Sequence, residues 1–401
     1  MSETHDLLLT INTGSSSLKA ALYCCQQPER RVLSVEIRRI GLPDGSLSVV
    51  DGDGGALLER REHFADHAAA LQQLFACLDE RGLTARLAAV GHRLVHGGPR
   101  YTQSQQIDAQ VLGGLRDLVD WAPEHLPQAI GAIEFIRNRF SRLPQVACFD
   151  TAFHRTLPRQ AKLFALPHAI SDDGLLRFGF HGLSYEYLVD QLRAIDPKHG
   201  GGRAVLAHLG NGASLAAVRE GVCIDTTMGF TPAGGLVMGT RTGDLDPGVL
   251  VYLLRTKRVA IEQLNTLINK QSGLLGVSGI SADMRDLLER RSDSPRAADA
   301  VELFCYQAKK FLAAFVAVLG GLDTIVFTAG IGEHAPAVRA QICADLEFLG
   351  VHLDTQRNWS HEPVISSPDS KVTVRVIPTD EDLMIARHTS HLLLTEGLEH
   401  A

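Results

Sequence analysis

The chain has 401 residues, of which 45% are hydrophobic and 21% are charged, and its formal net charge is −7. This composition is typical of a folded globular protein with room for two domains, and it excludes a disordered chain. Because the charge is modest and no long basic run is present, nucleic acid is not expected as a partner.

The sequence also argues against export and against a membrane partner. No cationic segment followed by a long apolar stretch precedes the first apolar run, so a secretory signal is not expected. The most apolar region, residues 311–322, is too short to span a bilayer and predicts a buried helix. Seven cysteines, an odd number without paired spacing, indicate reduced thiols and a cytoplasmic location.

Short apolar runs alternate with helical patterns along most of the chain, which predicts an α/β fold. Strands are expected over 7–12, 18–23, 88–95, 145–149, 203–209, 214–218, 222–226, 324–329 and 372–377. Helices are expected over 63–80, 108–120, 128–140, 183–194, 247–256, 296–319, 336–346 and 381–394. Pro247, Pro295 and Pro336 each mark the first turn of a helix, where the missing N–H of proline is tolerated.

The first apolar run ends in a short polar segment, Asn12-Thr13-Gly14-Ser15-Ser16-Ser17, and Lys19 adds a charge to the apolar run that follows. Small residues leave backbone N–H groups free to meet a phosphate, although a plain hairpin turn would look the same. The segment LTINTGSSSLKAAL (9–22) is echoed by LAHLGNGASLAAV (206–218), with Ser17 and Ser214 at matching points. The echo indicates duplicated domains facing a cleft, and chance similarity of two hairpins is the alternative.

Two segments in the first half carry candidate chemistry. In VGHRLVHGGPR (90–100) the histidines are spaced like a metal pair on a helix, but the glycines indicate a strand end, so metal is not expected there. Arg93 within this segment could grip a carboxylate or a phosphoryl group with two hydrogen bonds. Asp150 directly follows a strand, where a carboxylate could bind Mg²⁺, orient a nucleophile or merely cap the next turn.

The second half adds three more candidates. His181 stands between aromatic residues and a glycine before a helix, and alone it would more often be structural. Residues 226–248 form a long glycine-rich loop around Arg241, which is typical of a functional loop. Residues 327–336 follow a strand and open a helix, and 378–386 stack three acids at a helix start, where one of them could bind Mg²⁺.

Together these segments resemble the acetate kinase family. The motifs INTGSSSLK, VGHRLVHGG, FDTAFH, FGFHG, HLGNGAS, FTAGIGE and PTDEDLMIA, with the stretch MGFTPAGGLVMGTRTGDLDPG, follow the family's order from Leu7 to His388. The family belongs to the superfamily of sugar kinases, heat-shock chaperones and actin. The resemblance therefore implies an α/β fold of two duplicated ribonuclease-H-like (actin-like ATPase) domains around a nucleotide cleft. The domains would be residues 1–152 with 384–401, and residues 153–383.

The resemblance also implies a role for each matching residue. Catalytic roles fall to Asp150, as acid/base or orienting residue, and to His181 and Arg241, as stabilisers of the transition state. The small acid would be bound by Arg93, Val95, Phe180 and Pro232. ATP would be bound by Ser15, Ser16, Ser17, Lys19, His208, Leu209, Gly210, Asn211, Gly212, Asp283, Met284, Arg285, Gly330, Ile331, Gly332, Glu333 and His334. The metal, Mg²⁺ with Mn²⁺ as the alternative, would be bound by Asn12 and Glu381.

The implied reaction is the reversible in-line transfer of the γ-phosphoryl group of ATP to acetate, by a cytoplasmic homodimer. Glu124 stands where the family commonly has a leucine, and Leu126 where it has an asparagine, so propionate or another short carboxylate is the alternative acceptor. Val95 resembles the acetate enzymes more than those that prefer propionate. A non-enzymatic ATP-dependent binder is disfavoured, because the carboxylate-binding arginines would then have no role.

Overall fold

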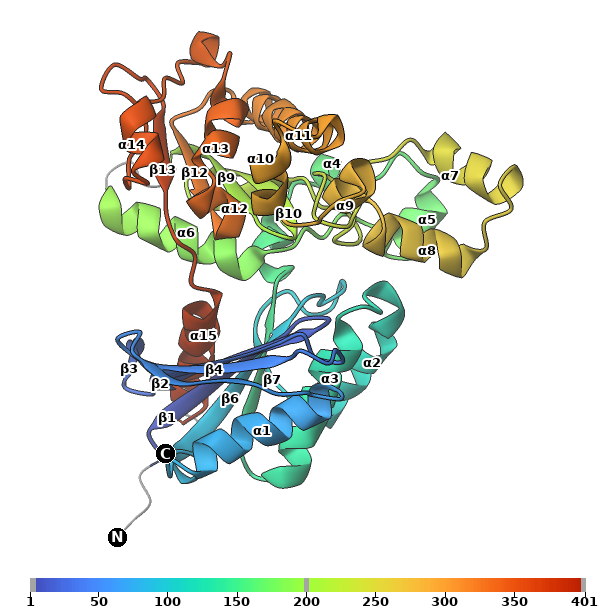
Figure 1. Cartoon of the computed structure of the whole chain (residues 1–401). Coiled ribbons are helices and arrows are strands. Elements are labelled where there is room, and N and C mark those ends of the chain that lie inside the picture. The colour runs from blue at the N-terminus through green and yellow to red at the C-terminus, as the bar shows by residue number, and fades with distance from the viewer. Residues whose placement is uncertain (1–4, 198–201, 398–401) are drawn as a thin grey trace. The chain divides into compact units, whose positions relative to one another are not determined.

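The computed structural model describes residues 5–197 and 202–397 (Figure 1). The chain divides into two compact units. Unit 1 comprises Met1–Ala152 and Asp380–Ala401, and unit 2 comprises Phe153–Thr379. All seven cysteines are free thiols. No helix in the described ranges is long and apolar enough to cross a membrane.

Unit 1 is built on an eight-stranded sheet with the order β5-β4-β3-β2-β1-β6-β8-β7. Strand β1 pairs antiparallel with β2 and parallel with β6, and β6 pairs parallel with β8. The carboxyl ends of β1, β6 and β8 therefore lie at one edge of the sheet. The strands are β1 Leu7–Thr13, β2 Ser17–Cys24, β3 Gln27–Arg38, β4 Ser46–Asp51, β5 Ala56–Arg61, β6 Leu87–Leu94, β7 Gln105–Gln106 and β8 Gln145–Phe149.

Helices cover both faces of this sheet. The helices of unit 1 are α1 His67–Asp79, α2 Ala109–Asp117, α3 Leu126–Arg139 and α15 Glu381–Gly397. Leu7, Leu9 and Ile11 alternate along β1 and face the core that α1 and α3 complete. The opposite face is covered by α15, the last helix of the chain, since a side chain at Gly91 of β6 would collide with Ile385 and Thr389 (Figure 1).

Unit 2 contains a five-stranded sheet with the order β11-β10-β9-β12-β13. Strand β9 pairs antiparallel with β10 and parallel with β12, and β12 pairs parallel with β13. The strands are β9 Arg203–Leu209, β10 Ala213–Arg219, β11 Val222–Thr226, β12 Thr324–Thr328 and β13 Thr373–Val376.

The helices of unit 2 flank this sheet, and two of them project away from it (Figure 1). Tyr185, Leu188 and Leu192 pack the face of α6 onto the sheet, and the projecting helices are α7 and α8. The helices are α4 Arg159–Lys162, α5 His168–Asp172, α6 Gly182–Ile195, α7 Pro247–Arg255, α8 Ile261–Lys270, α9 Gly273–Ser278, α10 Met284–Arg290, α11 Pro295–Leu319, α12 Ala329–His334, α13 Pro336–Cys343 and α14 Thr355–Trp359.

The two sheets repeat one arrangement. The run β3-β2-β1-β6-β8 of unit 1 and the run β11-β10-β9-β12-β13 of unit 2 each place three antiparallel strands beside two parallel ones. The predicted α/β fold with a duplicated domain is thereby confirmed. The three proline starts are confirmed as well, because α7, α11 and α13 begin at Pro247, Pro295 and Pro336.

Candidate active site

In unit 1, the candidate residues meet where β1, β6 and β8 end. Asn12 is near the end of β1, Arg93 is near the end of β6, and Asp150 directly follows β8. The backbone N–H of Asp150 donates to the Leu94 carbonyl at 2.9 Å, which continues the ladder and fixes the position of its carboxylate. Parallel strands bring their carboxyl ends to one edge, which is where open α/β sheets carry their binding sites.

Arg93 is the centre of this cluster. Its Nε donates to Asp150 Oδ1 at 3.0 Å and its Nη2 to Asp150 Oδ2 at 2.6 Å, so the pair is bidentate. Nη1 donates to Asn12 Oδ1 at 3.1 Å and lies 3.7 Å from Glu381 Oε2. Burial disfavours the charged guanidinium, yet the carboxylates of Asp150 and Glu381 outweigh that effect and raise the pKa of Arg93.

These bonds leave Arg93 with donors for a ligand. A guanidinium carries five N–H groups, and the hydrogen bonds to Asp150 and Asn12 engage three of them. Asp150 is completely buried, and its carboxylate is paired with Arg93 away from solvent. The arrangement gives a cation that is held in one orientation.

The start of α15 fits a hard cation. Glu381 is the first residue of the helix, and its carboxylate and the Asn12 carbonyl oxygen approach the same Arg93 nitrogen. Next to it, Asp382 Oδ1 is buried without a hydrogen-bond partner among the described residues. Burial, with the charges of Asp380 and Glu381, raises the pKa of Asp382 to about 6. Oxygen ligands with excess negative charge are what Mg²⁺ prefers.

Asp380 is already neutralised by another residue. Arg31 Nη2 lies 2.5 Å from Asp380 Oδ2, and Arg31 Nε donates to the hydroxyl of Tyr23 at 3.1 Å. In the described parts of the chain no group of three or more His, Cys, Asp or Glu is arranged to hold a metal. Mg²⁺ commonly takes one or two protein carboxylates and completes its shell with water and substrate phosphates, so Asn12 with Glu381 suits it.

The β1–β2 turn is the predicted phosphate loop of unit 1. Gly14 N–H donates to the Ser17 carbonyl at 2.8 Å, which makes the tight turn. Ser15 and Ser16 are exposed and Ser17 is half-buried. The Lys19 side chain is more than half exposed and lies 3.8 Å from Glu36 Oε1 on the next strand. The loop is therefore open to a ligand, and its lysine is paired only weakly.

In unit 2, two stacked imidazoles lie beside the β9–β10 turn. His181 immediately precedes α6 and has a left-handed backbone, with φ 59°. Its ring stacks on that of His208 with centroids 4.0 Å apart. His181 Nδ1 is 2.8 Å from Ser214 Oγ, and His208 Nδ1 is 2.9 Å from Ser184 Oγ. Both rings are thus held in fixed orientations.

The glycine-rich segment 226–248 brings Arg241 to the same turn. Gly239 N–H donates to the Asn211 carbonyl at 3.0 Å, and a Cβ at Gly239 would collide with the Asn211 side chain. A Cβ added to Gly212 would be 3.3 Å from His181 Nε2 and 3.5 Å from Arg241 Nη1. Unit 2 therefore gathers His181, Arg241 and the backbone of the turn 210–212 around one point.

The substrate-pocket candidates fall in both units. Val95 lies in unit 1, half-buried, whereas the buried Phe180 and the half-buried Pro232 lie in unit 2, where the Pro232 carbonyl accepts from Arg241 Nη1 at 3.2 Å. Leu126 is completely buried in the core of unit 1 and Glu124 is half-buried before it.

The remaining nucleotide candidates lie on two short helices of unit 2. Asp283 caps α10 and pairs with the exposed Arg285, while Met284 is buried. Gly330 to His334 form most of α12 after β12, and Glu333 Oε1 accepts from the backbone N–H of Ala329 at 2.7 Å. The Glu333 carboxylate is thus bound within its own helix.

A buried arginine, Arg339, donates hydrogen bonds to the backbone of α12. Arg339 is completely buried, and its Nη1 donates to the carbonyls of Gly332 and Glu333 at 2.9 and 2.8 Å. Its Nε and Nη2 donate to Asn358 at 2.8 and 2.7 Å. Burial without a carboxylate partner lowers the pKa of Arg339 to about 10. Sequence reasoning gave this residue no role.

Sequence reasoning also missed the network behind His181. Tyr185 hydroxyl lies 2.5 Å from Ser214 Oγ, and both residues are completely buried. The sequence marks Ser214 only as the counterpart of Ser17 in the repeated segment. Tyr185 follows His181 by four positions, one helical turn, and that spacing was the available signal.

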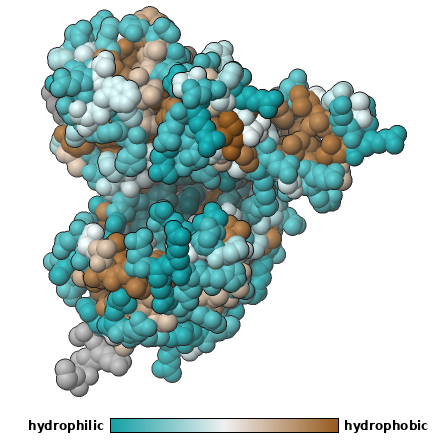
Figure 2. Space-filling model, viewed as in Figure 1, coloured by the Kyte–Doolittle hydropathy of each residue, from teal (hydrophilic) through white to brown (hydrophobic). Residues whose placement is uncertain are grey.

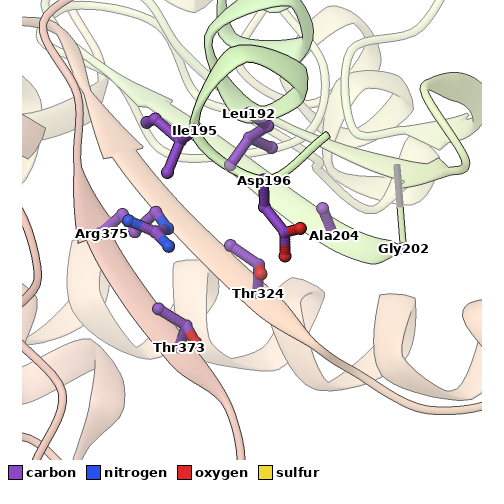
Figure 3. A pocket seen from close by; sticks show the side chains of 8 residues that line it. All are labelled: Leu192, Ile195, Asp196, Gly202, Ala204, Thr324, Thr373 and Arg375. Atoms are coloured by element: carbon purple, nitrogen blue, oxygen red, sulfur yellow. The ribbon is translucent and has the colours of Figure 1, made fainter. Parts of the chain in front are cut away.

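A small pocket elsewhere in unit 2 is not the active site. It has a volume of about 50 Å³ and is lined by Asp196, Thr324, Thr373 and Arg375 together with Leu192, Ile195, Gly202 and Ala204 (Figure 3). Thr324 and Thr373 are the first residues of β12 and β13, so the pocket lies at the end of the sheet opposite the carboxyl ends. It is also far smaller than a nucleotide site requires.

Comparison with known proteins gives one consistent result. Residues 7–387 match the acetokinase family model. The chain is 45% identical over 394 residues to an acetate kinase of Rhodopseudomonas palustris, covering 96% of this chain and 98% of that one. It is 43% identical over 396 residues to an acetate kinase of Methylocella silvestris, with the same coverage.

Solved structures agree with this result. A propionate kinase from Francisella tularensis superposes with a TM-score of 0.90 at 34% identity, covering 96% of this chain and 98% of that one. An acetate kinase from Porphyromonas gingivalis superposes with a TM-score of 0.86 at 36% identity, covering 97% of this chain and all of that one.

Proposed function

Because the chain belongs to the acetokinase family, we propose that it transfers the γ-phosphoryl group of ATP reversibly to acetate, giving acetyl phosphate and ADP. The observation that carries the proposal is Arg93, whose guanidinium is gripped bidentately by the buried Asp150 yet keeps N–H groups free for a carboxylate. A fixed cation at the carboxyl edge of the sheet suits a small anionic substrate.

The chemistry needs little from the protein beyond positioning and charge. A carboxylate oxygen of the acid attacks the γ-phosphorus, and the bond from that phosphorus to the bridging oxygen breaks, with its electron pair leaving on ADP. No base is needed, since the nucleophile is already an anion. The obstacle is to hold two anions in line and to stabilise charge on the transferring phosphoryl group.

The candidate residues of each unit meet one part of that obstacle. Arg93 binds the acid, and Asp150 keeps the guanidinium in one orientation. Arg241 and His181 donate to the oxygens of the transferring group, each contributing a few kcal/mol in rough terms. The turns 14–17 and 210–212 offer backbone N–H groups to the phosphates. Asn12 and Glu381 would hold Mg²⁺, which offsets negative charge on the polyphosphate.

The acceptor is proposed to be acetate, with propionate as the second candidate. Val95, Phe180 and Pro232 are the apolar groups available for the methyl end of the acid. The Francisella tularensis structure named a propionate kinase superposes as well as the acetate kinases do. Propionate is therefore the second candidate acceptor. Leu126 packs in the core of unit 1.

Hydroxylamine trapping of acyl phosphate tests both the proposed reaction and the proposed acceptor. The purified protein is incubated with ATP, Mg²⁺ and acetate, propionate or butyrate, and hydroxamate is quantified across concentrations. We expect the largest kcat/KM with acetate. A clear preference for propionate would replace the acceptor, and ATP binding without acyl phosphate from any acid would replace the kinase reading with an ATP-dependent binder.

A cytoplasmic homodimer completes the proposal. Among the described residues, none of α7 is buried, and Val249, Val251 and Tyr252 leave an apolar surface on it. Figure 2 shows this brown surface on the part of unit 2 that carries α7 and α8. An apolar patch of this kind commonly marks a protein interface. Light scattering coupled to gel filtration should give twice the mass of the chain.

A further inference from the structure

Behind the His181 ring, three side chains form a continuous hydrogen-bonded chain. His181 Nδ1 lies 2.8 Å from Ser214 Oγ, and the same Oγ lies 2.5 Å from the Tyr185 hydroxyl. Ser214 and Tyr185 are completely buried, on β10 and α6 respectively. Neither hydroxyl can therefore exchange its partner for solvent, so the direction of each hydrogen bond is set by the protein.

The direction follows from counting donors and acceptors. Ser214 Oγ is the one acceptor that residues 5–197 and 202–397 present to the Tyr185 O–H, and a buried hydroxyl left without an acceptor is costly. Burial raises the pKa of the Tyr185 phenol, so its hydroxyl keeps the proton that it donates. Tyr185 is thus the donor to Ser214, and Ser214 keeps its own proton for His181 Nδ1.

The opposite direction would break the chain. If His181 carried its proton on Nδ1, it would donate to Ser214 Oγ, which could then either donate to Tyr185 or accept from it as well. In the first case the Tyr185 O–H, and in the second the Ser214 O–H, would have no acceptor among the described residues. The same objection applies to a ring protonated on both nitrogens. The hydrogen-bond chain therefore favours a neutral His181 with its proton on Nε2.

We propose that Ser214 and Tyr185 are positioning residues that hold His181 in the Nε2–H tautomer, so that Nε2 always presents a donor to the transferring phosphoryl group. The Nε2 atom lies beside the turn 210–212 and near Arg241 Nη1, since a Cβ on Gly212 would be within 3.5 Å of both. The tautomer itself belongs to the free protein. Its catalytic consequence rests on the proposed function.

The surroundings prevent the ring from escaping this constraint. The His181 ring stacks on His208, whose Nδ1 is held by Ser184 Oγ at 2.9 Å. His154 Nε2 bonds the Phe180 carbonyl at 2.9 Å, and its ring meets Tyr185 edge-on at 5.8 Å. A ring flip, which would put Cδ2 in the place of Nδ1, would have to turn the imidazole out of this stack. The neighbouring titratable and charged groups of unit 2 are His208, Tyr185 and Arg241.

Nitrogen-15 NMR of the free protein tests the tautomer directly. Protein labelled with ¹⁵N-histidine is recorded at a pH above 7.5, and the resonances of His181 are assigned by their loss in His181→Asn. We expect a proton on Nε2 and a bare Nδ1 in the wild type, and a mixture of both tautomers in Ser214→Ala. Ser184→Ala is the matched control, which should move the His208 resonances and leave the tautomer of His181 unchanged. A proton on Nδ1 in the wild type would overturn the proposal.

The contribution of Tyr185 is tested by its isosteric variant. Tyr185→Phe keeps the ring but removes the donor to Ser214 Oγ. Among the described residues His181 Nδ1 is then still the acceptor for the Ser214 O–H, so the Nε2–H tautomer should remain the major form. In the double variant with Ser214→Ala, Tyr185→Phe should add no further change, because it acts through Ser214. Additive shifts in the double variant would refute the chain. Circular dichroism and Tm confirm that each variant is folded.

Kinetics separate positioning from a merely structural role. Ser214→Ala should lower kcat roughly 10- to 100-fold, less than loss of the donor itself would, while KM for ATP and acetate changes less than about threefold. A loss of kcat with an unchanged tautomer would reject the positioning role. If no acid gives acyl phosphate but the tautomer responds as stated, the proposed function fails while the inference about His181 stands.

Discussion

The two units hold their candidate residues in opposite ways. In unit 1 the site is a cluster of charges, with Arg93 between Asp150, Asn12 and Glu381. In unit 2 the histidine is held by hydroxyls and by ring stacking. A fixed positive charge attracts an anion that approaches from any direction, whereas an uncharged donor of fixed orientation binds only an acceptor that lies along its N–H bond. The two units therefore share a topology, but unit 1 provides charge for binding and unit 2 provides a directional donor.

The two turns differ in what lies behind them. The turn 14–17 joins Thr13 to Leu18 and is exposed at Ser15 and Ser16, and the turn 210–212 joins Leu209 to Ala213. Ser17 is half-buried, while its counterpart Ser214 is completely buried against His181. One phosphate-type loop thus faces solvent with a lysine nearby, and the other is backed by an imidazole. The two turns therefore have the same place in their sheets, but different side chains pack behind them.

The largest expected effect is on the charged half. Arg93→Ala leaves Asp150 buried without its bidentate partner, so we expect about 3–5 kcal/mol of lost stability and a fall in kcat/KM for acetate of roughly 10³-fold. Urea denaturation and the hydroxamate assay measure the two. The double variant Arg93→Ala/Asp150→Ala should recover part of the stability but no activity.

An exposed ion pair of the same geometry provides the control. Arg203 is bidentate with Asp323, with the shorter contact at 2.6 Å, but both side chains are well exposed. Arg203→Ala should cost much less stability than Arg93→Ala. Equal losses would mean that burial of Asp150 does not matter, and the contrast between charged core and surface would disappear.

Arg241 tests whether unit 2 contributes charge only at the transition state. Arg241→Ala should lower kcat roughly 10²- to 10³-fold while Kd for ATP changes by less than about fivefold, because its donor is needed for the transferring group. Arg241→Lys keeps the charge but loses the planar fork and should recover only a small part. Equal losses in kcat and in ATP affinity would assign Arg241 to ground-state binding.

The strands near the site were predictable because each is a short, mainly apolar run. The runs 7–12, 145–149 and 203–209 became β1, β8 and β9 with ends within a residue of the prediction. The echo of 9–22 in 206–218 predicted the repeated topology. By contrast β3, β4 and β5 were missed, because β3 opens on the polar Gln27 to Arg31 and β5 is almost wholly exposed. β5 lies at the edge of the sheet, and its exposed residues give no apolar pattern that would reveal it.

Partners between distant residues could not be predicted in the same way. Nothing in the order of residues says that the buried Asp150 grips Arg93, which is 57 positions away, or that Arg339 holds Gly332 and Asn358. The resemblance supplied roles for Arg93 and His181, but it gave none to Tyr185 or Ser214. Side-chain pairing depends on where strands end in space, and that is known only after the fold is.

Each unit also contains a fully buried histidine whose pKa is lowered, which predicts a pH dependence of stability. Burial lowers the pKa of His92 in unit 1 and of His154 in unit 2 to about 4, from 6.5. Between pH 6.5 and 4 the unfolded chain therefore binds protons that the folded chain refuses, so stability falls as pH falls. The loss is about 2 kcal/mol per histidine between pH 7 and 4.5.

Glutamine variants isolate the two contributions. His92→Gln in unit 1 and His154→Gln in unit 2 should each flatten the decline of the unfolding free energy between pH 6.5 and 4.5, measured by urea denaturation at several pH values. Both start less stable at pH 7, because the bonds of the imidazoles to Gln145 and to the Phe180 carbonyl are altered. If the slope is unchanged, the histidine concerned is protonated in the folded protein, and the symmetry between the units is lost.

The smallest expected effects come from one substitution made in both turns. A Cβ at Gly14 would meet the Ser17 Oγ at 2.6 Å, and a hydroxyl can rotate away, so Gly14→Ala should change kcat less than about threefold. A Cβ at Gly212 would be 3.3 Å from His181 Nε2, in the space where a phosphoryl oxygen must meet that donor, so Gly212→Ala should lower kcat roughly tenfold. Neither position has a left-handed backbone, so stability should change little in either variant. Comparable kinetic effects would show that the two turns handle phosphate alike, and the imidazole behind the second turn would then have no special part in transfer.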